Sequence, residues 1–248
     1  MNEPAQTTHF GFKTVAEAEK ASLVRGVFDS VAPSYDLMND LMSLGIHRLW
    51  KNAFIDAVKP RPGEHLLDVA GGTGDIAFRF LKRGGDAVTV CDINAEMLKV
   101  GRERAIDKGH LQGLDWVVGD AEALPVPDAS YDAYTIAFGL RNVTHIERAL
   151  AEARRILKPG GRFFCLEFSH VVLPLFDKIY DTYSFSVLPW LGEKVAGDAQ
   201  AYQYLAESIR RFPPQEELAD MMEEAGLERA RFRNLSGGIA AIHWAWRL

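Results

Sequence analysis

The sequence lacks the features that define several classes of protein. It has only two cysteines, Cys91 and Cys165, each inside an apolar run typical of a strand. We expect buried free thiols and a reducing compartment rather than a disulfide framework. No apolar run reaches the about 20 residues that a membrane-spanning helix requires. The first fifteen residues hold neither a signal-peptide core nor an arginine. We therefore expect a cytoplasmic protein, at most peripheral to the inner membrane, and favour a bacterial cytoplasm over an organelle matrix.

An excess of basic charge is also missing. The formal net charge is -6, and charges of both signs are spread along the chain. A protein that binds nucleic acid should instead concentrate basic side chains on one face, so we expect no nucleic-acid partner. Hydrophobic residues make up 48% of the 248 residues, enough for the core of one large domain without disulfides. No metal site is expected either.

Apolar runs and helical patterns alternate from His65 onward. Each apolar run is nearly continuous, which is typical of a parallel sheet with helices on both faces. The expected strands are 65–70, 87–91, 115–118, 134–137 and 162–168, and the helices between them are 75–82, 95–107 and 146–157. The segment Lys158-Pro159-Gly160-Gly161 is expected to end the last of these helices. Two further strands, 228–235 and 239–247, flank Ser236-Gly237-Gly238, which favours an antiparallel hairpin.

The remaining segments suggest three parts. Residues 1–15 are polar, and we expect them to be flexible. Residues 16–62 show helical periodicity and are expected to form a helical N-terminal cap, interrupted at Pro33. Residues 63–248 would form the main domain, with a helical lid inserted at about 171–212.

A glycine-rich turn gives the strongest local signal. It runs from Leu67 to Asp75 and carries Gly71, Gly72 and Gly74 between a strand and a helix. Glycines there let the backbone approach a ligand at the carboxyl edge of the sheet. Asp75 would repel a phosphate but attract an ammonium group, which favours an amino-acid-bearing nucleoside over a dinucleotide. A purely structural turn is the alternative.

Acidic residues follow the next two strands. Asp92 ends the second strand, where a carboxylate can bind both ribose hydroxyls. Asp120 and Ala121 follow the third strand, in place to meet an adenine edge. An aspartate at a strand end is often only a helix cap, but the repetition makes a nucleoside site the better interpretation.

These segments, with several others, resemble the UbiE family of ubiquinone/menaquinone biosynthesis C-methyltransferases. The resemblance is carried by residues 27–39, 67–75, 122–125, 138–143, 157–161 and 202–210. Phe138-Gly139-Leu140-Arg141-Asn142 is its most specific part, together with Tyr204-Leu205-Ala206-Glu207-Ser208-Ile209.

The resemblance implies a Rossmann-like class I methyltransferase: a seven-stranded, mostly parallel sheet with an antiparallel last strand. It implies S-adenosylmethionine as the methyl donor. With the glycine turn, the expected cofactor-binding residues are Gly71, Thr73, Gly74, Asp92, Asp120, Ala121 and Ala137. The family often has serine at the last of these positions, so any contact by Ala137 must use its backbone.

The resemblance also implies a prenylated quinol as the methyl acceptor, either demethylmenaquinol or 2-methoxy-6-polyprenyl-1,4-benzoquinol, or both. A ring hydroxyl has a pKa of about 10, so its ionisation requires a base or a positive environment. Arg141 and Asn142 are the expected catalytic residues, the arginine stabilising the phenolate and the asparagine orienting the ring oxygen. A structural ion pair between Arg141 and the region of Asp132 is the alternative.

Other candidates remain open at this point. His145 and His243 are candidate general bases, although lone histidines are more often structural. Tyr35 and Asp36 are expected to close over the donor, unless Asp36 only caps a helix. The apolar stripe from Leu175 to Leu188 suits a channel for the prenyl tail, a membrane contact, or ordinary core.

Three rival functions are retained. They are an NAD-dependent oxidoreductase, a methyltransferase for a sterol, lipid or other small molecule, and a structural subunit of a quinone-synthesis complex. As to partners, the sequence leaves open a peripheral membrane contact, such a complex, and a homodimer.

Overall fold

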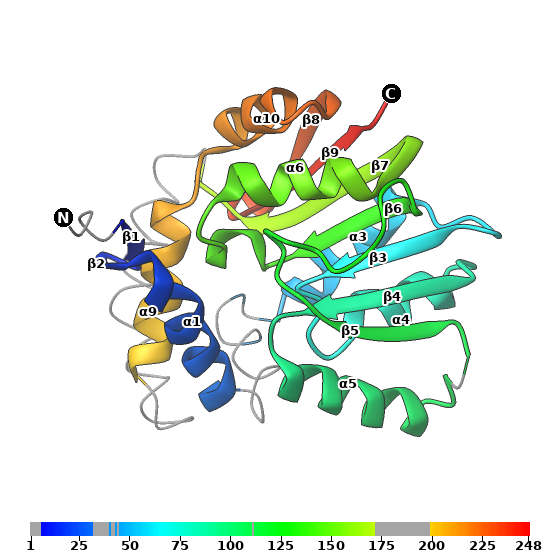
Figure 1. The fold of residues 1–248 in the computed structure, drawn as a ribbon, viewed down its shortest axis with the longest axis horizontal. Coiled ribbons are helices and arrows are strands. Elements are labelled where there is room, and N and C mark those ends of the chain that lie inside the picture. Colours follow the sequence, from blue (N-terminus) through cyan, green and yellow to red (C-terminus); the bar gives the residue numbers. More distant parts are fainter. Residues whose placement is uncertain (1–5, 32–39, 41–42, 44, 111, 172–198) are drawn as a thin grey trace.

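The computed structural model describes residues 6–31, 40, 43, 45–110, 112–171 and 199–248 (Figure 1). Its centre is a seven-stranded sheet of order β5-β4-β3-β6-β7-β9-β8. The strands are β3 (His65–Val69), β4 (Ala87–Asp92), β5 (Leu114–Val118), β6 (Tyr131–Ala137), β7 (Leu157–Phe168), β8 (Glu228–Leu235) and β9 (Ala240–Trp246). β3 to β7 are parallel, and β9 runs antiparallel to both β7 and β8. The predicted sheet and its closing hairpin are confirmed.

The apolar strands build two cores because successive side chains point to opposite faces. Leu66 belongs to a cluster with Phe54 and Phe80 on one face. Leu67 belongs to a second cluster with Leu150 and Met222 on the other. Helices α3 (His47–Val58) and α4 (Asp75–Lys82) cover the first face, and α6 (Ile146–Ile156) and α10 (Gln215–Glu224) the second (Figure 1). Cys91 and Cys165 are buried free thiols, as expected.

Three more helices bear on the site. α5 (Ala95–Asp107) packs beside β4 and β5 and is capped by Asn94, whose side chain accepts hydrogen bonds from the backbone N–H groups of Glu96 and Met97. α1 (Glu17–Val31) and α9 (Ala199–Arg211) lie against each other at one end of the sheet, on the left in Figure 1.

The N-terminal segment differs from its prediction. Instead of a flexible stretch, residues 7–16 form an antiparallel pair of strands, β1 (Thr7–Phe10) and β2 (Lys13–Ala16). The ring of Phe10 stacks on that of Tyr204 with centroids 4.1 Å apart, and the backbone N–H of Phe12 donates to Glu207 at 2.9 Å. Both partners lie on α9, so the order comes from contacts distant in sequence that local polarity cannot reveal.

Strand β7 also begins earlier than predicted. Lys158-Pro159-Gly160-Gly161 was expected as a loop but belongs to the strand, which pairs with β6 through a register shift. The cause is the neighbouring end of β9, because Gly160 N–H donates to the Arg247 carbonyl and Arg247 N–H donates to the Gly161 carbonyl. β6 itself starts at Tyr131, earlier than predicted.

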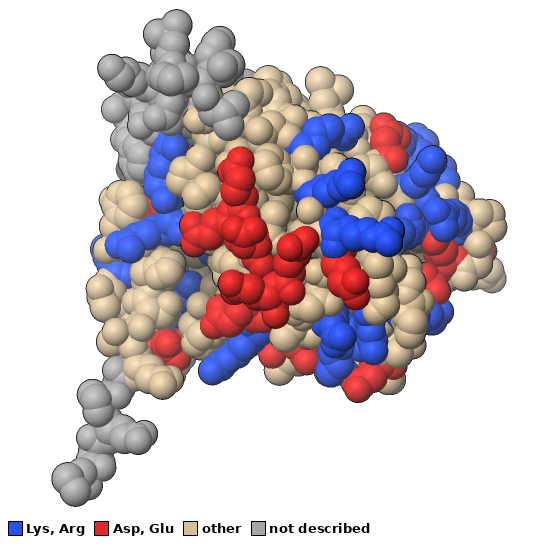
Figure 2. Space-filling view, turned by 90° about the horizontal axis from the view of Figure 1, so that it is seen from above, with Lys and Arg blue, Asp and Glu red and all other residues tan. Residues whose placement is uncertain are grey.

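Residues 172–198, most of the expected lid, lie outside the described residues, and α9 lies in the last part of that expected segment. The division into cap, main domain and lid stays a prediction. Within the described ranges, no helix is long and apolar enough to cross a membrane. The face seen in Figure 2 has acidic side chains gathered near its middle and basic ones on either side.

Candidate functional site

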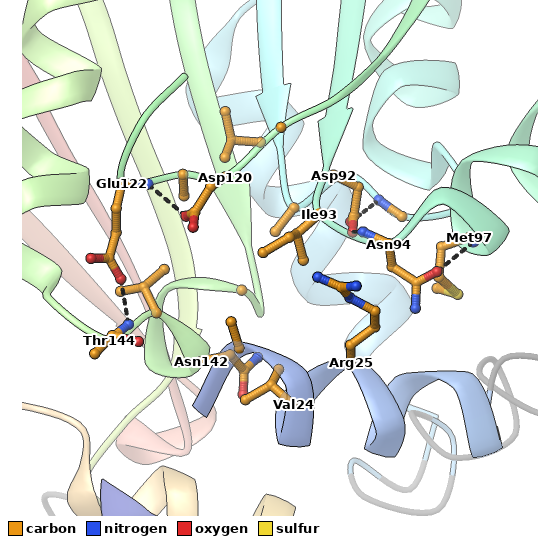
Figure 3. A pocket seen from close by; sticks show the side chains of 18 of the residues that line it. Val24, Arg25, Asp92, Ile93, Asn94, Met97, Asp120, Glu122, Asn142 and Thr144 are labelled. Atoms are coloured by element: carbon orange, nitrogen blue, oxygen red, sulfur yellow. Dashed lines mark hydrogen bonds between the residues drawn. The ribbon is translucent and has the colours of Figure 1, made fainter. Parts of the chain in front are cut away.

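A cavity lies where β3, β4, β5 and β6 end. It holds about 850 Å³ of space that no atom fills, and this figure includes open solvent. Ligands of open α/β sheets bind at this edge of the strands. Helix α1 forms the opposite wall, from which Val24 and Arg25 reach toward the loops after the strands (Figure 3). We call this space the main cavity.

Of the three glycines in the turn, Gly72 is the one that lines the main cavity. Its backbone φ is +53°, a conformation that favours glycine, and its N–H donates to Asp92 at 2.8 Å. Gly71 and Gly74 serve packing instead. A Cβ on Gly71 would lie 2.6 Å from Val90, and one on Gly74 would lie 2.8 Å from Trp116.

Thr73 turns away from the main cavity, because its hydroxyl accepts a hydrogen bond from Arg104 at 3.1 Å. Gly71, Thr73 and Gly74 thus shape the turn without lining the cavity, and their contact with a cofactor stays a prediction. Gly72 was not among the predicted cofactor-binding residues, although it belongs to the glycine turn from which Gly71 and Gly74 were predicted.

Asp92 lines the main cavity at the end of β4 (Figure 3). One carboxylate oxygen accepts from Gly72 N–H and the other from Asn94 N–H, both at 2.8 Å. Burial raises the pKa of Asp92 to about 6, although these backbone hydrogen bonds oppose the shift. A carboxylate offers about four acceptor positions, so Asp92 keeps capacity for ligand hydroxyls.

Asp120 and Ala121 line the same cavity, as predicted from their place after β5. Asp120 accepts from the backbone N–H of Glu122 at 2.9 Å. Glu122 also lines the cavity, but its carboxylate accepts from the backbone N–H groups of Thr144 and His145 at 2.6 and 3.0 Å. Glu122 therefore holds the loop after β6, a role that sequence reasoning missed.

Asp68 is a second buried acid close to the turn. One of its oxygens accepts from the hydroxyl of Thr135 at 2.8 Å, and the other has no hydrogen-bond partner. Burial raises the pKa of Asp68 to about 7, and the charges of Asp75 and Asp92 add to the effect. In the sequence, Asp68 stands out as an aspartate inside an otherwise apolar strand, but it was not predicted as a site residue.

Asp75 does not lie on the cavity. Its carboxylate binds Lys51 Nζ at 2.9 Å and Arg79 Nε at 3.0 Å. Burial raises the pKa of Asp75, but Lys51 and Arg79 more than offset this, so its pKa lies below the usual value. The ammonium group that the sequence predicted at Asp75 is therefore that of Lys51, because α3 packs against α4.

Arg141 and Asn142 lie in a short helical turn after β6, η2 (Leu140–Asn142), but face different ways. Asn142 lines the main cavity, and its side-chain oxygen accepts from the Tyr204 hydroxyl at 3.0 Å. Arg141 is buried and binds Glu167 and the carbonyl of Phe138, each at 2.6 Å.

The structural alternative for Arg141 had the wrong partner. Asp132 binds Lys158 Nζ at 2.7 Å and the backbone N–H of His65 at 2.9 Å, so Glu167 is the acid that Arg141 meets. Arg141 faces a second, neighbouring space rather than the main cavity. Its role and that of Asn142 in catalysis stay predictions.

With this geometry established, comparison with known proteins is decisive. The model of the ubiE/COQ5 methyltransferase family matches residues 13–247. The chain belongs to this family. It is a methyltransferase, and the alternative of an NAD-dependent oxidoreductase is therefore wrong.

Individual relatives agree with the family match. The ubiquinone/menaquinone biosynthesis C-methyltransferase UbiE of Paracoccus denitrificans (strain Pd 1222) is 59% identical, over 100% of this chain and 99% of its own. The mitochondrial 2-methoxy-6-polyprenyl-1,4-benzoquinol methylase of Mus musculus is 54% identical, over 98% of this chain and 85% of its own.

Two solved structures support the fold alone. A SAM-dependent methyltransferase of Thermotoga maritima aligns with a TM-score of 0.64 at 22% identity, over 90% of this chain and 99% of that one. Phosphoethanolamine N-methyltransferase 2 of Haemonchus contortus, solved with S-adenosyl-L-methionine, aligns with a TM-score of 0.59 at 15% identity, over 80% of this chain and 52% of that one.

The remaining candidates of this methyltransferase can now be placed. Ala137 ends β6 but does not line the main cavity, whereas the next two residues, Phe138 and Gly139, do. His243 lies buried in β9 with Nε2 on the carbonyl of Gln215, and burial lowers its pKa to about 4. Because it faces α10 and lines neither cavity, His243 is a wrong candidate for the base.

His145 joins α1 to the loop after β6. Its Nδ1 lies 2.8 Å from Glu122, and its Nε2 lies 3.3 Å from Glu17 of α1. The hydrogen bond with Glu122 raises the pKa of His145. A histidine held between two carboxylates is better suited to docking α1 over the cavity than to taking a proton from a ligand. Tyr35, Asp36 and the stripe from Leu175 to Leu188 lie outside the described residues.

Proposed function

We propose that this methyltransferase transfers the methyl group of S-adenosylmethionine to a ring carbon of a prenylated quinol, either 2-methoxy-6-polyprenyl-1,4-benzoquinol or demethylmenaquinol, or both. The Mus musculus relative is named for the benzoquinol, and the Paracoccus denitrificans relative is named for ubiquinone and menaquinone biosynthesis. The observation that carries the proposal is the main cavity, where Asp92 and Asp120 meet the glycine turn on one side and Asn142 closes the other. A sterol or other lipid acceptor has no comparable support.

The cavity residues fit the proposed cofactor. Asp92 is fixed by two backbone N–H groups and can accept from both ribose hydroxyls. Asp120 and Ala121 stand where an adenine edge would lie, and Gly72 lets the ligand approach the backbone. Asp68 places an acid with an unpartnered oxygen close to the turn, which favours a positively charged ligand.

S-adenosylmethionine supplies, when bound, a methyl group on a positively charged sulfur. The acceptor carbon would take this methyl group with a ring electron pair, the electron pair of the C–S bond would stay on sulfur, and the ring C–H proton would pass to water to restore aromaticity. Ionisation of the neighbouring hydroxyl favours this attack, because a phenolate pushes electron density into the ring. The task of the protein is orientation and charge stabilisation.

Asn142 and the apolar wall of α1 are assigned to this task. The amide of Asn142 lies on the cavity wall and can orient a ring oxygen, while its own oxygen is fixed by Tyr204. The wall formed by Ala21 and Val24 of α1 is apolar and keeps water from the reacting centre.

The prenyl tail supports a proposed peripheral contact with a membrane, since such a tail resides in lipid. The predicted stripe for that contact, Leu175 to Leu188, lies outside the described residues. A quinone-synthesis complex and a homodimer stay proposals of the same kind.

Methyl transfer from labelled S-adenosylmethionine to chemically reduced, short-tailed benzoquinols and demethylmenaquinols tests the function. Asp92→Asn should lose most activity, whereas Asp107→Asn, on the exposed end of α5, should match the wild type. Methylation of neither quinol by a protein that binds the cofactor would refute the acceptor. Equal rates for the two variants would refute the assignment of Asp92.

A further inference from the structure

A second space adjoins the main cavity, and the two share Val143 and Thr144 as lining residues. It holds about 380 Å³ of space that no atom fills, open solvent included, between η2, α1, β1 and α9. Its charged lining residues are Lys20, Arg141 and Arg211, with His9 beside them. None of the described residues that line it is an acid. We call it the basic cavity.

Lys20 is unusual because it is a buried lysine for which the described residues supply no ion pair. Only 2% of it is exposed, and its ammonium donates to the carbonyl of Val143 at 2.8 Å. An ammonium has three N–H donors, and among the described residues no acceptor is found for the other two. Burial lowers the pKa of Lys20, while the charges of Glu122 and Glu17 act in the opposite direction from a distance.

Arg141 adds a second unused donor. Its side chain is 3% exposed, and its Nη1 is taken by Glu167 and the carbonyl of Phe138. Its Nε has no hydrogen-bond partner although it is buried. A buried N–H without a partner destabilises a protein, so an absent acceptor is the natural explanation.

The pKa of His9 indicates a positive electrostatic potential in the basic cavity. Burial lowers the pKa of His9, and the positive charges of Lys20 and Arg211 lower it further. With His9 neutral and Glu167 bound to Arg141, Lys20 and Arg211 remain as cations in the lining, and the acids Glu17 and Glu122 act on Lys20 from outside that lining. The basic cavity therefore favours a negatively charged ligand.

The rest of the lining indicates which kind of anion. Ile146, Tyr204 and Phe212 also line the basic cavity and supply apolar and aromatic surface. The hydroxyl of Tyr204 is already donated to Asn142, and burial raises the pKa of Tyr204, so it stays protonated at neutral pH. Apolar walls with cationic donors suit an aromatic ring bearing a charged oxygen better than a bare inorganic ion.

We infer that the basic cavity is an oxyanion site for the ionised ring hydroxyl of the acceptor, in which Lys20 is the cation that acts beside Arg141. This inference rests on the proposed function and adds to it a residue from the N-terminal helix. Lys20 remains protonated throughout, and the hydroxyl proton leaves to water. The shared wall of Val143 and Thr144 places the ring next to the main cavity, where the methyl group would arrive.

The expected effect follows from charge proximity. A cation close to an acid lowers the pKa of that acid by about 1 to 3. A phenol bound in the basic cavity should therefore ionise at a lower pH than in water, and loss of the Lys20 charge should remove much of this effect. Arg141 should supply the remainder, because its guanidinium stays charged at all relevant pH values.

The test uses 4-nitrophenol, whose phenolate is yellow, titrated with the full chain across pH. The wild type should bind the phenolate and lower its pKa by about 1 or more. Lys20→Met should weaken phenolate binding about tenfold or more, in line with loss of a nearby charge. Lys20→Arg should retain binding, and Lys13→Met, on exposed β2, is the matched control and should equal the wild type.

Thermal unfolding controls for the hydrogen bond to Val143 that Lys20→Met removes. If Lys20→Met does not fold, Lys20→Gln, which can keep a donor but lacks the charge, takes its place. The inference would be overturned if the charge-removing variant and the wild type bind the phenolate equally well and give the probe the same pKa. Displacement of the probe by inorganic phosphate but not by phenol would also overturn it, since the site would then be a general anion site.

The two proposals fail separately. If quinols are methylated by Lys20→Met with wild-type rate and pH profile, the function stands and the oxyanion site is wrong. If no quinol is methylated but the probe still ionises in a Lys20-dependent way, the oxyanion site stands and the proposed acceptor is wrong.

Discussion

The buried pair of Arg141 and Glu167 makes a sharp prediction about stability. The two side chains are 3% and 1% exposed and lie 2.6 Å apart. Arg141→Met leaves the Glu167 carboxylate buried without a counter-charge. Removing one partner of such a pair costs about 3–5 kcal/mol. At about 2–4 °C per kcal/mol for a chain of this size, the midpoint of thermal unfolding should fall by about 6–20 °C.

The loss should depend on pH in a definite direction. Burial raises the pKa of Glu167, and Arg141 opposes that shift, so in the variant the pKa rises further. A carboxyl whose pKa is higher in the folded than in the unfolded chain binds its proton more tightly when folded. Its folded state therefore gains stability as the pH falls. The deficit of Arg141→Met relative to the wild type should shrink between pH 8 and pH 5.

A paired variant separates stability from chemistry. Glu167→Gln keeps an oxygen acceptor for the backbone N–H of Phe168, which Glu167 binds at 2.9 Å. Combined with Arg141→Met it removes both charges and should restore much of the stability, measured by urea unfolding. Methyl transfer by this stable double variant then reports on Arg141 itself. A deficit of Arg141→Met below about 1 kcal/mol, or one that is equal at pH 8 and pH 5, would refute this reasoning.

Three further predictions concern the cofactor side. Asp92→Asn removes a charge and turns an amide N–H toward the backbone donors. The affinity for S-adenosylmethionine, measured by calorimetry, should fall about 10- to 100-fold. This loss corresponds to about 1.5–3 kcal/mol, as is typical of hydrogen bonds to a charged group. Wild-type affinity should fall as the pH drops through 7 and 6, because Asp68 and Asp92, with pKa values of about 7 and about 6, take up protons and lose negative charge; equal affinity at pH 8 and pH 5 would contradict this. Gly101→Ala would place a Cβ 2.4 Å from the ring of Trp116 and should cost about 1–3 kcal/mol in urea unfolding, while an unchanged midpoint would show that the ring can move aside.

Local sequence patterns were sufficient for most of the sheet and for one side of the site. The run from His65 to Lys82 combines an apolar strand, a glycine turn and an amphipathic helix, and the structure has these elements at the predicted place. Asp92 and Asp120 were found because the carboxyl ends of parallel strands meet at one edge. Both residues line the main cavity, and their contact with a cofactor stays a prediction.

The features that sequence reasoning missed depend on contacts between distant segments. The order of β1 and β2 relies on Glu207, which is 195 positions from Phe12. The partner of Arg141 could not be chosen among many acids, and Glu167 looked like part of an apolar strand. Lys20 looked like one of several charged residues on an amphipathic helix, because only tertiary packing shows that it is buried.

The order of the strands in space has a consequence for how the chain folds. β9 lies between β7 and β8, although β8 precedes it in sequence, so β8 cannot join the sheet until β9 has paired with it. Until that hairpin docks, the twelve residues of β7 expose one row of backbone donors and acceptors beside largely apolar side chains. An open edge of this kind is a template for pairing with other chains. Aggregation during refolding should therefore depend on how fast the β8–β9 hairpin forms. Substitutions that introduce charge on that hairpin should change the extent of this aggregation.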